Sequence, residues 1–394
     1  MNSDWRVSMS TPVSQRVSQM PRSAIHEMTR LSREVDDVAF LSWAKPTSDT
    51  PEHIKRAAIR AIEAGKTGGY SVPDGLGELR QEIAEKLREV NRIETSLEEI
   101  IITVGAIEGL AAAVMAVVDP GDEVIIPVPG YSTHIRQVLL ASAKPVCIPT
   151  IEENGFSLDI QRIHDAITEK TKAILFSDPN NPTGSVYSHE ELQQIAGIAR
   201  KYDLVIITDE AYEYFTFDGC RHESIASFPG MKERVISAFT FTKTYAMTGW
   251  RIGYLHAAKD YIVQIKKAHI PLAICAPVVS QYAALGALRQ SQKCVDDFRE
   301  HYKNMRDLMC SRLDRLGQVF EYQIPRGSYL MFPKIKLDAG ADSLAFAKRL
   351  LKEARVSTTP GVAFESESHV RMSFCVPEEM INKAFDRMEN YFQS

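Results

Sequence analysis

The feature that most constrains the fold is an alternation, from about residue 98 onward, between short β-branched runs and longer amphipathic stretches. The seven short runs span residues 100–104, 123–127, 145–148, 173–176, 204–208, 235–239 and 252–255. Each run is almost continuously hydrophobic, which is typical of strands buried on both faces. Strands that alternate with helices in this way form mainly parallel sheets covered by helices on both faces. The sequence therefore predicts an α/β protein with a mainly parallel central sheet.

Helical periodicity and a change of texture after residue 280 suggest a second, smaller unit. Helices are predicted at 107–118, 188–202, 259–269, 278–316, 343–354 and 377–392. Strand-like segments at 328–332 and 369–374 lie among the last of these helices. The first 50 residues hold one strand candidate, 38–42, which we expect to dock onto the C-terminal part. The smaller unit is therefore expected to be an α+β domain built from both chain ends.

These patterns predict three segments along the chain. Residues 1–50 form an N-terminal segment that packs with the small domain, residues 51–282 form the large domain, and residues 283–394 form the small C-terminal domain. No Gly/Ser-rich or Pro-rich linker separates them, so the domains are expected to pack against each other.

Composition excludes several classes of protein. The 394 residues include 46 Lys+Arg and 51 Asp+Glu, a net charge of −5 that argues against a basic nucleic-acid binder. No apolar run reaches the roughly 18 residues that cross a membrane. The N-terminus lacks the apolar core of a secretory signal, although its serine content leaves a transit peptide open. Six scattered cysteines without a CxxC pair favour reduced thiols and a cytoplasmic protein.

The segment 240–251 is the most informative for chemistry. Thr240, Thr242, Lys243 and Arg251 follow a predicted buried strand directly, and open α/β sheets bind ligands at the carboxyl ends of their strands. These side chains suit a phosphate together with one reactive carbonyl. The alternative is that Lys243 is an ordinary surface cation and that the threonines only form a turn.

Two other predicted strands end in polar residues. Asp209 directly follows the run 204–208, and the phenol of Tyr212 comes three residues later. A carboxylate at that depth needs a cationic partner, such as a protonated pyridine nitrogen, or else it caps a helix. Asn181, in Asn-Pro-Thr-Gly, follows the run 173–176 and offers an amide to a phenolate-type oxygen, or belongs to a plain loop. The histidines, His134 among them, are isolated and are expected to have ordinary surface or core roles.

Taken together, Asn181-Pro-Thr-Gly, Asp209-x-x-Tyr212 and Thr242-Lys243 with Thr-Gly-Trp-Arg251 resemble the class I/II aminotransferases. These are fold-type I enzymes, similar to aspartate aminotransferase, that use pyridoxal 5′-phosphate (PLP). The likeness extends over nearly the whole chain, from the segment 14–21 to the closing segment 370–374.

The resemblance implies a role for each motif residue. Lys243 is similar to the lysine that binds the cofactor covalently and later moves the α-proton. Asp209 is similar to the acid that keeps the pyridine nitrogen protonated, and Tyr212 and Asn181 to the groups that contact its 3′-oxygen. The phosphate site implied by the resemblance consists of Thr240, Thr242, Arg251 and the turn of Gly105, Ala106 and Ile107.

The resemblance also extends to the substrate and to a second subunit. Tyr131 matches an aromatic ring that stacks on the cofactor, and Arg371 matches the arginine that binds the substrate α-carboxylate. The alternative for Arg371 is a surface ion pair. Asn181 also borders the substrate in this family. Tyr70 resembles the tyrosine that reaches the phosphate of a neighbouring subunit, which implies a homodimer with shared active sites.

The substrate wall departs from the family pattern. A glycine-rich turn common in the family is replaced here by the segment 41–46, where Trp43 is expected to border the substrate pocket. Asp178 stands where the family commonly has Asn, and the segment 132–134 is also unusual. The predicted function is PLP-dependent transamination between an α-amino acid and a 2-oxo acid, without nucleic-acid or membrane partners. A specialised PLP enzyme of elimination, replacement or cyclisation is the main alternative, and a non-catalytic PLP sensor is a remote one.

Overall fold

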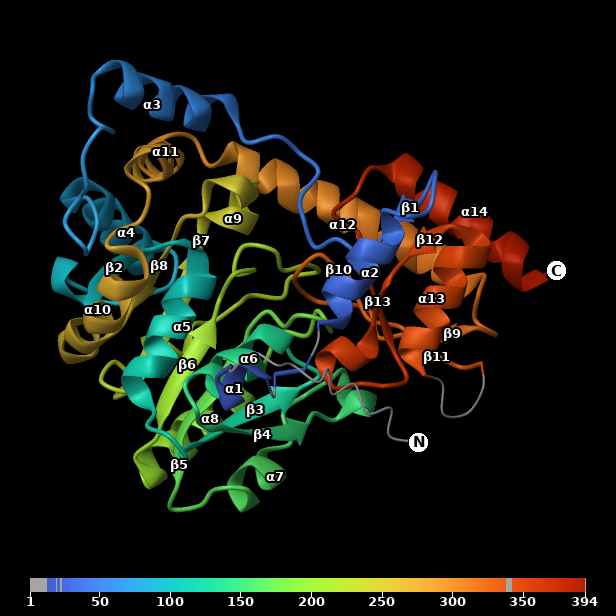
Figure 1. Cartoon of the computed structure of the whole chain (residues 1–394), viewed down its shortest axis with the longest axis horizontal. Coiled ribbons are helices and arrows are strands. Elements are labelled where there is room, and N and C mark those ends of the chain that lie inside the picture. The colour runs from blue at the N-terminus through green and yellow to red at the C-terminus, as the bar shows by residue number, and fades with distance from the viewer. Residues whose placement is uncertain (1–12, 19, 22, 338–341, 394) are drawn as a thin grey trace.

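The computed structural model describes residues 13–18, 20–21, 23–337 and 342–393, and its centre is a seven-stranded sheet (Figure 1). The strand order is β2-β8-β7-β6-β5-β3-β4. The bounds are β2 Ile100–Thr103, β3 Glu123–Val128, β4 Lys144–Pro149, β5 Thr171–Ser177, β6 Val205–Asp209, β7 Val235–Thr240 and β8 Gly253–His256. The strands β4, β3, β5, β6 and β7 pair in parallel, whereas β8 is antiparallel to both β7 and β2. The seven predicted strands and the mainly parallel sheet are confirmed.

Each face of this sheet has its own hydrophobic core, because successive strand residues point to opposite faces. Ile206 belongs to one core and Ile207 to the other. The helices of this part are α3 Glu52–Glu63, α4 Gly77–Glu89, α5 Gly105–Val117, α6 Ser132–Leu140, α7 Ile160–Asp165, α8 His189–Tyr202, α9 Phe241–Thr244, α10 Lys259–Ala273 and α11 Val278–Arg289. The helices α4, α8 and α11 contribute to the core of Ile206, and α5, α6 and α10 to that of Ile207. Burial on both faces explains why the strand sequences are so uniformly apolar.

The remaining elements gather beside the sheet in a smaller α+β unit, toward the right of Figure 1. Its helices are α2 Ala24–Ser32, α12 Lys293–Asp314, α13 Ser343–Ala354 and α14 Glu378–Gln393, and the four-residue helix α1 Gln15–Ser18 precedes them. Its short strands are β1 Ala39–Phe40, β9 Phe320–Glu321, β10 Leu330–Met331, β11 Lys334–Ile335, β12 Val356–Ser357, β13 Thr359–Pro360 and β14 Val370–Ser373. Strand β1 pairs in parallel with β12, which places residues 39–40 beside residues 356–357. The domain limits at residues 50 and 282 stay a prediction.

The single helix expected at 278–316 is wrong, because two helices occupy this stretch. Helix α11 ends at Arg289 and α12 begins at Lys293, and the backbone of Gln290 is extended between them. The side-chain amide of Gln292 donates to the carbonyl of Ala287, which satisfies a free group at the end of α11. Helix α11 packs into a core of the sheet, whereas Tyr302 of α12 lies in the core of the smaller unit. The two helices therefore need different directions.

Within the described residues, no helix combines the length and the apolar character that a membrane span requires.

Candidate active site

A cavity of about 410 Å³ opens at the edge of the sheet where the parallel strands end. Asp209 is the last residue of β6, Thr240 is the last of β7, and α5 begins shortly after β2. The predicted site residues that line the cavity are Trp43, Ala106, Ile107, Tyr131, Asn181, Asp209, Tyr212, Thr240, Thr242, Lys243, Arg251 and Arg371. The fold thus brings together residues that are more than 300 positions apart in the sequence.

Lys243 lies on the short helix α9, directly after β7. The hydroxyl oxygen of Thr240 caps this helix by accepting from the backbone N–H of Thr242, at 3.1 Å. The Lys243 ammonium donates to the carbonyl of Ala44 at 2.8 Å. Burial lowers the pKa of Lys243 to about 8, and the positive charges of Arg371 and Arg251 act in the same direction. An amine with such a pKa is available as a nucleophile and as a base near neutral pH.

Asp209 has two neighbours that the sequence did not reveal. Its Oδ2 lies 3.2 Å from Nε2 of His134, and its Oδ1 accepts from the backbone N–H of Ala211 at 3.2 Å. No α-helix or 3₁₀-helix follows Asp209 directly, so the helix-capping alternative is wrong. His134 is fully buried in α6, and its ring meets the ring of Tyr131 edge to face. His134 is thus a core residue, as one of the two expected roles had it, but its imidazole also contacts Asp209, a predicted cofactor residue.

Arg371 is buried in β14 and not paired on the surface. Its Nη1 donates to Oδ1 of Asn181 at 3.1 Å, and its Nη2 donates to the carbonyl of Ser42 at 3.0 Å. Among the described residues it has no carboxylate partner, and its Nε is buried without a hydrogen bond. A buried guanidinium without a counter-charge is costly. The surface ion-pair alternative is wrong, and the cavity offers this cation a place for an anion.

The rings of Tyr212 and Tyr329 lie near the amine of Lys243. Tyr212 is buried, its ring meets that of Tyr329 edge to face at 5.0 Å, and the Lys243 ammonium lies 5.9 Å from its ring centre. Burial raises the pKa of Tyr212 well above the ordinary value for a phenol. Tyr212 is therefore protonated at neutral pH and is available as a hydrogen-bond donor.

The opposite end of the cavity suits an anion. Arg251 Nη1 donates to the carbonyl of Thr248 at 3.2 Å and lies 3.5 Å from Oγ1 of Thr242. Gly105, the first residue of α5, has φ +71°, and a Cβ there would lie 2.5 Å from Arg251 Nη2. Gly105 does not line the cavity itself, but its missing side chain lets Arg251 reach the first turn of α5. Free N–H groups at a helix N-terminus and a guanidinium together favour a phosphate.

The segment 41–46 forms one wall of the cavity. Trp43 lines the cavity, is 39% exposed, and stacks on Phe40 with ring centres 4.7 Å apart. Lys45 also lines it, and this exposed cation has no hydrogen bond or ion pair with any described residue. Sequence reasoning noted the altered segment but did not single out Lys45.

Tyr70 lies away from this cavity. Its side chain is 81% exposed and does not line the cavity of its own chain. The role implied for Tyr70 requires a second copy of the chain, so it stays a prediction.

Comparisons with known proteins agree with this geometry. Residues 37–388 match the model of the family "Aminotransferase class I and II". An aspartate aminotransferase of Pyrococcus abyssi is 40% identical over 96% of this chain and 97% of its own. An aromatic-amino-acid aminotransferase of Thermococcus litoralis is 38% identical over the same shares. The structure of Thermus thermophilus aspartate aminotransferase with maleate superposes with a TM-score of 0.91 at 35% identity, covering 96% of this chain and 99% of that one.

These likenesses span almost the full length of the chain, the family model included, and they confirm the expected fold-type I architecture. The relatives are named for the transfer of amino groups. The chain therefore belongs to the class I and II aminotransferases and is an enzyme that transfers an amino group between an α-amino acid and a 2-oxo acid.

Proposed function

We propose that the enzyme carries PLP in the cavity, bound covalently to Lys243, and uses it for transamination. The donor set fits this cofactor in three places. Asp209 offers a carboxylate to a pyridinium nitrogen, Lys243 offers a weakly basic amine to the aldehyde, and Arg251 with the first turn of α5 offers cationic and N–H groups to the phosphate. Thr240 and Thr242 add hydroxyls at the phosphate end, and Tyr131 adds a ring that can stack on the pyridine.

Bound PLP supplies an electron sink that makes the substrate Cα–H bond acidic. The chain's residues do the rest. Lys243 Nζ, once it is free of the cofactor, would take the proton from the substrate Cα and return it to the former aldehyde carbon of the cofactor, which then carries the amino group. Asp209, which His134 contacts at 3.2 Å, would place its carboxyl group beside the pyridine nitrogen. Tyr212 and Asn181 donate hydrogen bonds to the 3′-oxygen.

Arg371 is proposed to bind the substrate α-carboxylate. It is buried, it has no carboxylate partner among the described residues, and its Nε is unpaired. An arginine fork matches a carboxylate with two parallel bonds, which a lysine cannot reproduce. Binding there orients the substrate toward Lys243, whose ammonium shares the same cavity.

The wall of the cavity supports two substrate classes. Trp43 offers an apolar ring, and Lys45 offers an unpaired cation, both on one short segment. The names of the relatives carry the same two classes, aspartate and aromatic amino acids. We therefore propose that the side chain of an acidic substrate lies near Lys45 and that of an aromatic substrate against Trp43.

A homodimer completes the proposal. Tyr70 is 81% exposed. Other large apolar side chains of the large domain are also exposed, namely Val72, Ile107, Val263, Ile270, Leu272 and Ile274. Helix α5 packs against α10, so the exposed residues of these two helices belong to neighbouring elements. Light scattering with size-exclusion chromatography tests the dimer, and a monomer at enzyme-assay concentrations would contradict it. A cytoplasmic location stays a prediction.

The observation that carries the proposal is the buried amine of Lys243 with its pKa lowered to about 8, in one cavity with Asp209 and Arg371. The direct test is to titrate the PLP-loaded protein with amino acids while recording its visible absorption. We expect loss of the visible band, one equivalent of 2-oxo acid per site by mass spectrometry, and reversal by added 2-oxo acid. Release of ammonia or of a side-chain fragment instead would contradict transamination.

A further inference from the structure

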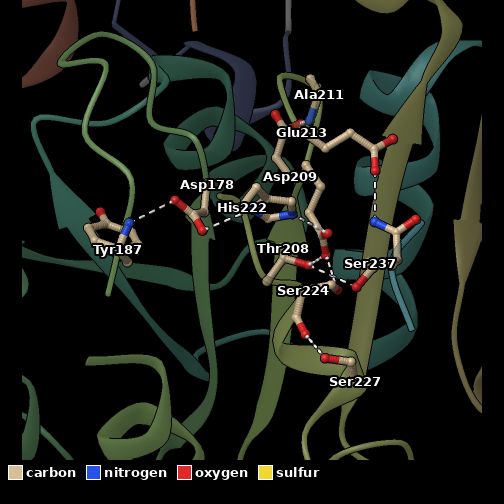
Figure 2. A network of polar contacts seen from close by, with 12 residues as sticks. Asp178, Tyr187, Thr208, Asp209, Ala211, Glu213, His222, Ser224, Ser227 and Ser237 are labelled. Carbon is tan, nitrogen blue, oxygen red and sulfur yellow. Dashed lines mark hydrogen bonds and ion pairs between the residues drawn. The ribbon is translucent and has the colours of Figure 1, made fainter. Parts of the chain in front are cut away.

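Three buried titratable side chains form a row behind the cavity, outside the residues that line it. His222 Nδ1 lies 3.2 Å from Oδ2 of Asp178, and its Nε2 lies 2.8 Å from Oε2 of Glu210. All three side chains are buried, with exposed fractions of 5% for His222, 2% for Asp178 and 1% for Glu210. Figure 2 shows Asp178 and His222 pointing toward each other. We call Asp178, His222 and Glu210 the buried triad.

The remaining oxygens of the triad are also bonded. Oδ1 of Asp178 accepts from the backbone N–H of Tyr187 at 3.1 Å. Oε1 of Glu210 accepts from the hydroxyl of Ser224 at 2.8 Å and from that of Thr208 at 2.8 Å. Both carboxylates therefore keep a fixed orientation toward the imidazole.

The two contacts and the pKa of His222 together favour a protonated imidazole. A neutral imidazole has one N–H and cannot donate to two carboxylates, whereas an imidazolium can. Burial lowers the pKa of His222, but the hydrogen bonds and charges of Asp178 and Glu210 outweigh it and raise this pKa to about 10. Burial raises the pKa of Asp178, whereas the hydrogen bond to His222 acts in the opposite direction. The triad therefore places an imidazolium between two buried carboxyl groups, and removing any one of the three leaves the others without their partner.

The triad connects the two strand ends that carry proposed cofactor contacts. Asp178 follows β5 directly and precedes Asn181 by three residues, while Glu210 is the residue after Asp209. Ser177 of β5 is in register with Asp209, and the backbone N–H of Asp178 donates to the carbonyl of Asp209 at 3.1 Å. Between these ends, His222 adds a charged bridge from a loop that belongs to neither strand.

We propose that His222 is a positioning residue that fixes the distance between Asn181 and Asp209 through its bonds to Asp178 and Glu210. This inference rests on the proposed function, in which Asn181 contacts the 3′-oxygen of PLP and Asp209 its ring nitrogen. The 3′-oxygen and the ring nitrogen are held at a fixed distance by the rigid pyridine ring. A small change in the separation of Asn181 and Asp209 therefore weakens both hydrogen bonds. The triad itself touches neither substrate nor cofactor.

The main experiment compares His222→Gln with wild type in two measurements. The glutamine amide can donate to one carboxylate only and turns its oxygen toward the other. We expect the dissociation constant of PLP to rise roughly tenfold. We also expect the pH midpoint of the visible absorption of the loaded protein to move upward by roughly half a unit to one unit, because the Asn181 bond that lowers this midpoint is misaligned.

Two controls separate positioning from general stability. His256→Gln changes another buried histidine of the sheet, whose ring nitrogens have no hydrogen-bond partner in the described part of the chain. We expect it to change the thermal stability of the apoprotein but neither PLP measurement. Asp178→Asn keeps an acceptor for His222 and is expected to stay near wild type, whereas Asp178→Leu removes the acceptor and is expected to resemble His222→Gln. If His222→Gln does not fold, the comparison of Asp178→Asn with Asp178→Leu tests the same inference.

A further readout needs no cofactor. In apoprotein labelled with ¹⁵N-histidine, the His222 resonances are expected to show both ring nitrogens protonated at neutral pH. A neutral His222, wild-type PLP affinity and midpoint in His222→Gln, or the same losses in His256→Gln would each overturn the inference. The proposed function fails in a different way, if wild-type protein forms no visible band that depends on Lys243.

Discussion

The two ends of the active-site cavity are built differently. At the cofactor end, Asp209 and Arg251 adjoin strands of the central sheet and have fixed partners, His134 at 3.2 Å and the Thr248 carbonyl at 3.2 Å. At the substrate wall, Trp43 is 39% exposed and Lys45 has no bond to any described residue. The backbone of the segment 41–46 is held by Lys243 and Arg371, but its side chains Trp43 and Lys45 have few partners. The sheet edge therefore fixes the residues proposed for the chemistry, while the side chains proposed to contact the substrate are less constrained. Sites that rest on regular elements are held more accurately than sites on loops.

Replacing Lys243 gives the largest expected effect and tests whether the cofactor end alone decides activity. We expect Lys243→Ala to lower kcat by at least about 10⁴-fold, because both the covalent attachment and the proton transfer are lost. Steady-state kinetics and visible spectra of the loaded protein measure this. Lys45→Ala removes the other lysine of the cavity and is expected to keep the visible band. Similar losses in both variants would contradict the division between the two ends.

Arg371→Leu is expected to have the next largest effect. Removing one partner of a buried carboxylate–guanidinium pair costs about 2–5 kcal/mol, which here appears chiefly as a higher KM for amino acids. Arg371→Lys keeps the charge but loses the paired geometry, so it is expected to fall between leucine and wild type. Kinetics with one amino acid across the three proteins gives the order. An unchanged KM in Arg371→Leu would refute the proposed role.

The lowered pKa of Lys243 predicts a pH dependence of the apoprotein's stability. Between pH 8 and 10.5 the unfolded chain holds a proton that folded Lys243 has lost, so this group alone makes stability rise with pH. Below pH 8 the charge is buried in the folded state, and Lys243→Met is expected to be more stable than wild type. The difference in unfolding free energy should shrink as the pH approaches 10.5. A difference that is independent of pH would mean that the pKa is not shifted.

Changes at the substrate wall are expected to be the smallest and the most selective. An exposed ion pair contributes about 0–1 kcal/mol, so Lys45→Met should lower kcat/KM for aspartate by up to about fivefold and leave phenylalanine unaffected. Trp43→Leu should instead lower kcat/KM for phenylalanine and leave kcat/KM for aspartate unaffected. Equal losses for both substrates in either variant would remove the proposed separation of the two side-chain positions.

The sequence predicted the elements and residues whose signal is local. The seven strands follow from uniformly apolar runs, and Lys243 and Asp209 follow from polar residues placed directly after such runs. His134 was underestimated because a single histidine on a helix has no distinguishing pattern, although it lies three residues after Tyr131. The break between α11 and α12 was missed because no proline or glycine marks it. It arises from tertiary packing, since Val295 is the only buried residue of α12 that shares the core of α11, and α12 packs from Tyr302 onward into the core of the smaller unit.

The reversed direction of β8 has a consequence for how the enzyme assembles during folding. Because β8 is antiparallel to β7, its N-terminal end lies at the same sheet edge as the C-terminal end of β7. Lys243 and Arg251, eight residues apart in the chain, therefore line the same cavity. Closing so short a loop costs little entropy, whereas Arg371 reaches Asn181 across 190 residues. A partly folded chain that has formed the central sheet but not the smaller unit would therefore have its proposed phosphate residues in place before Arg371, the proposed substrate contact.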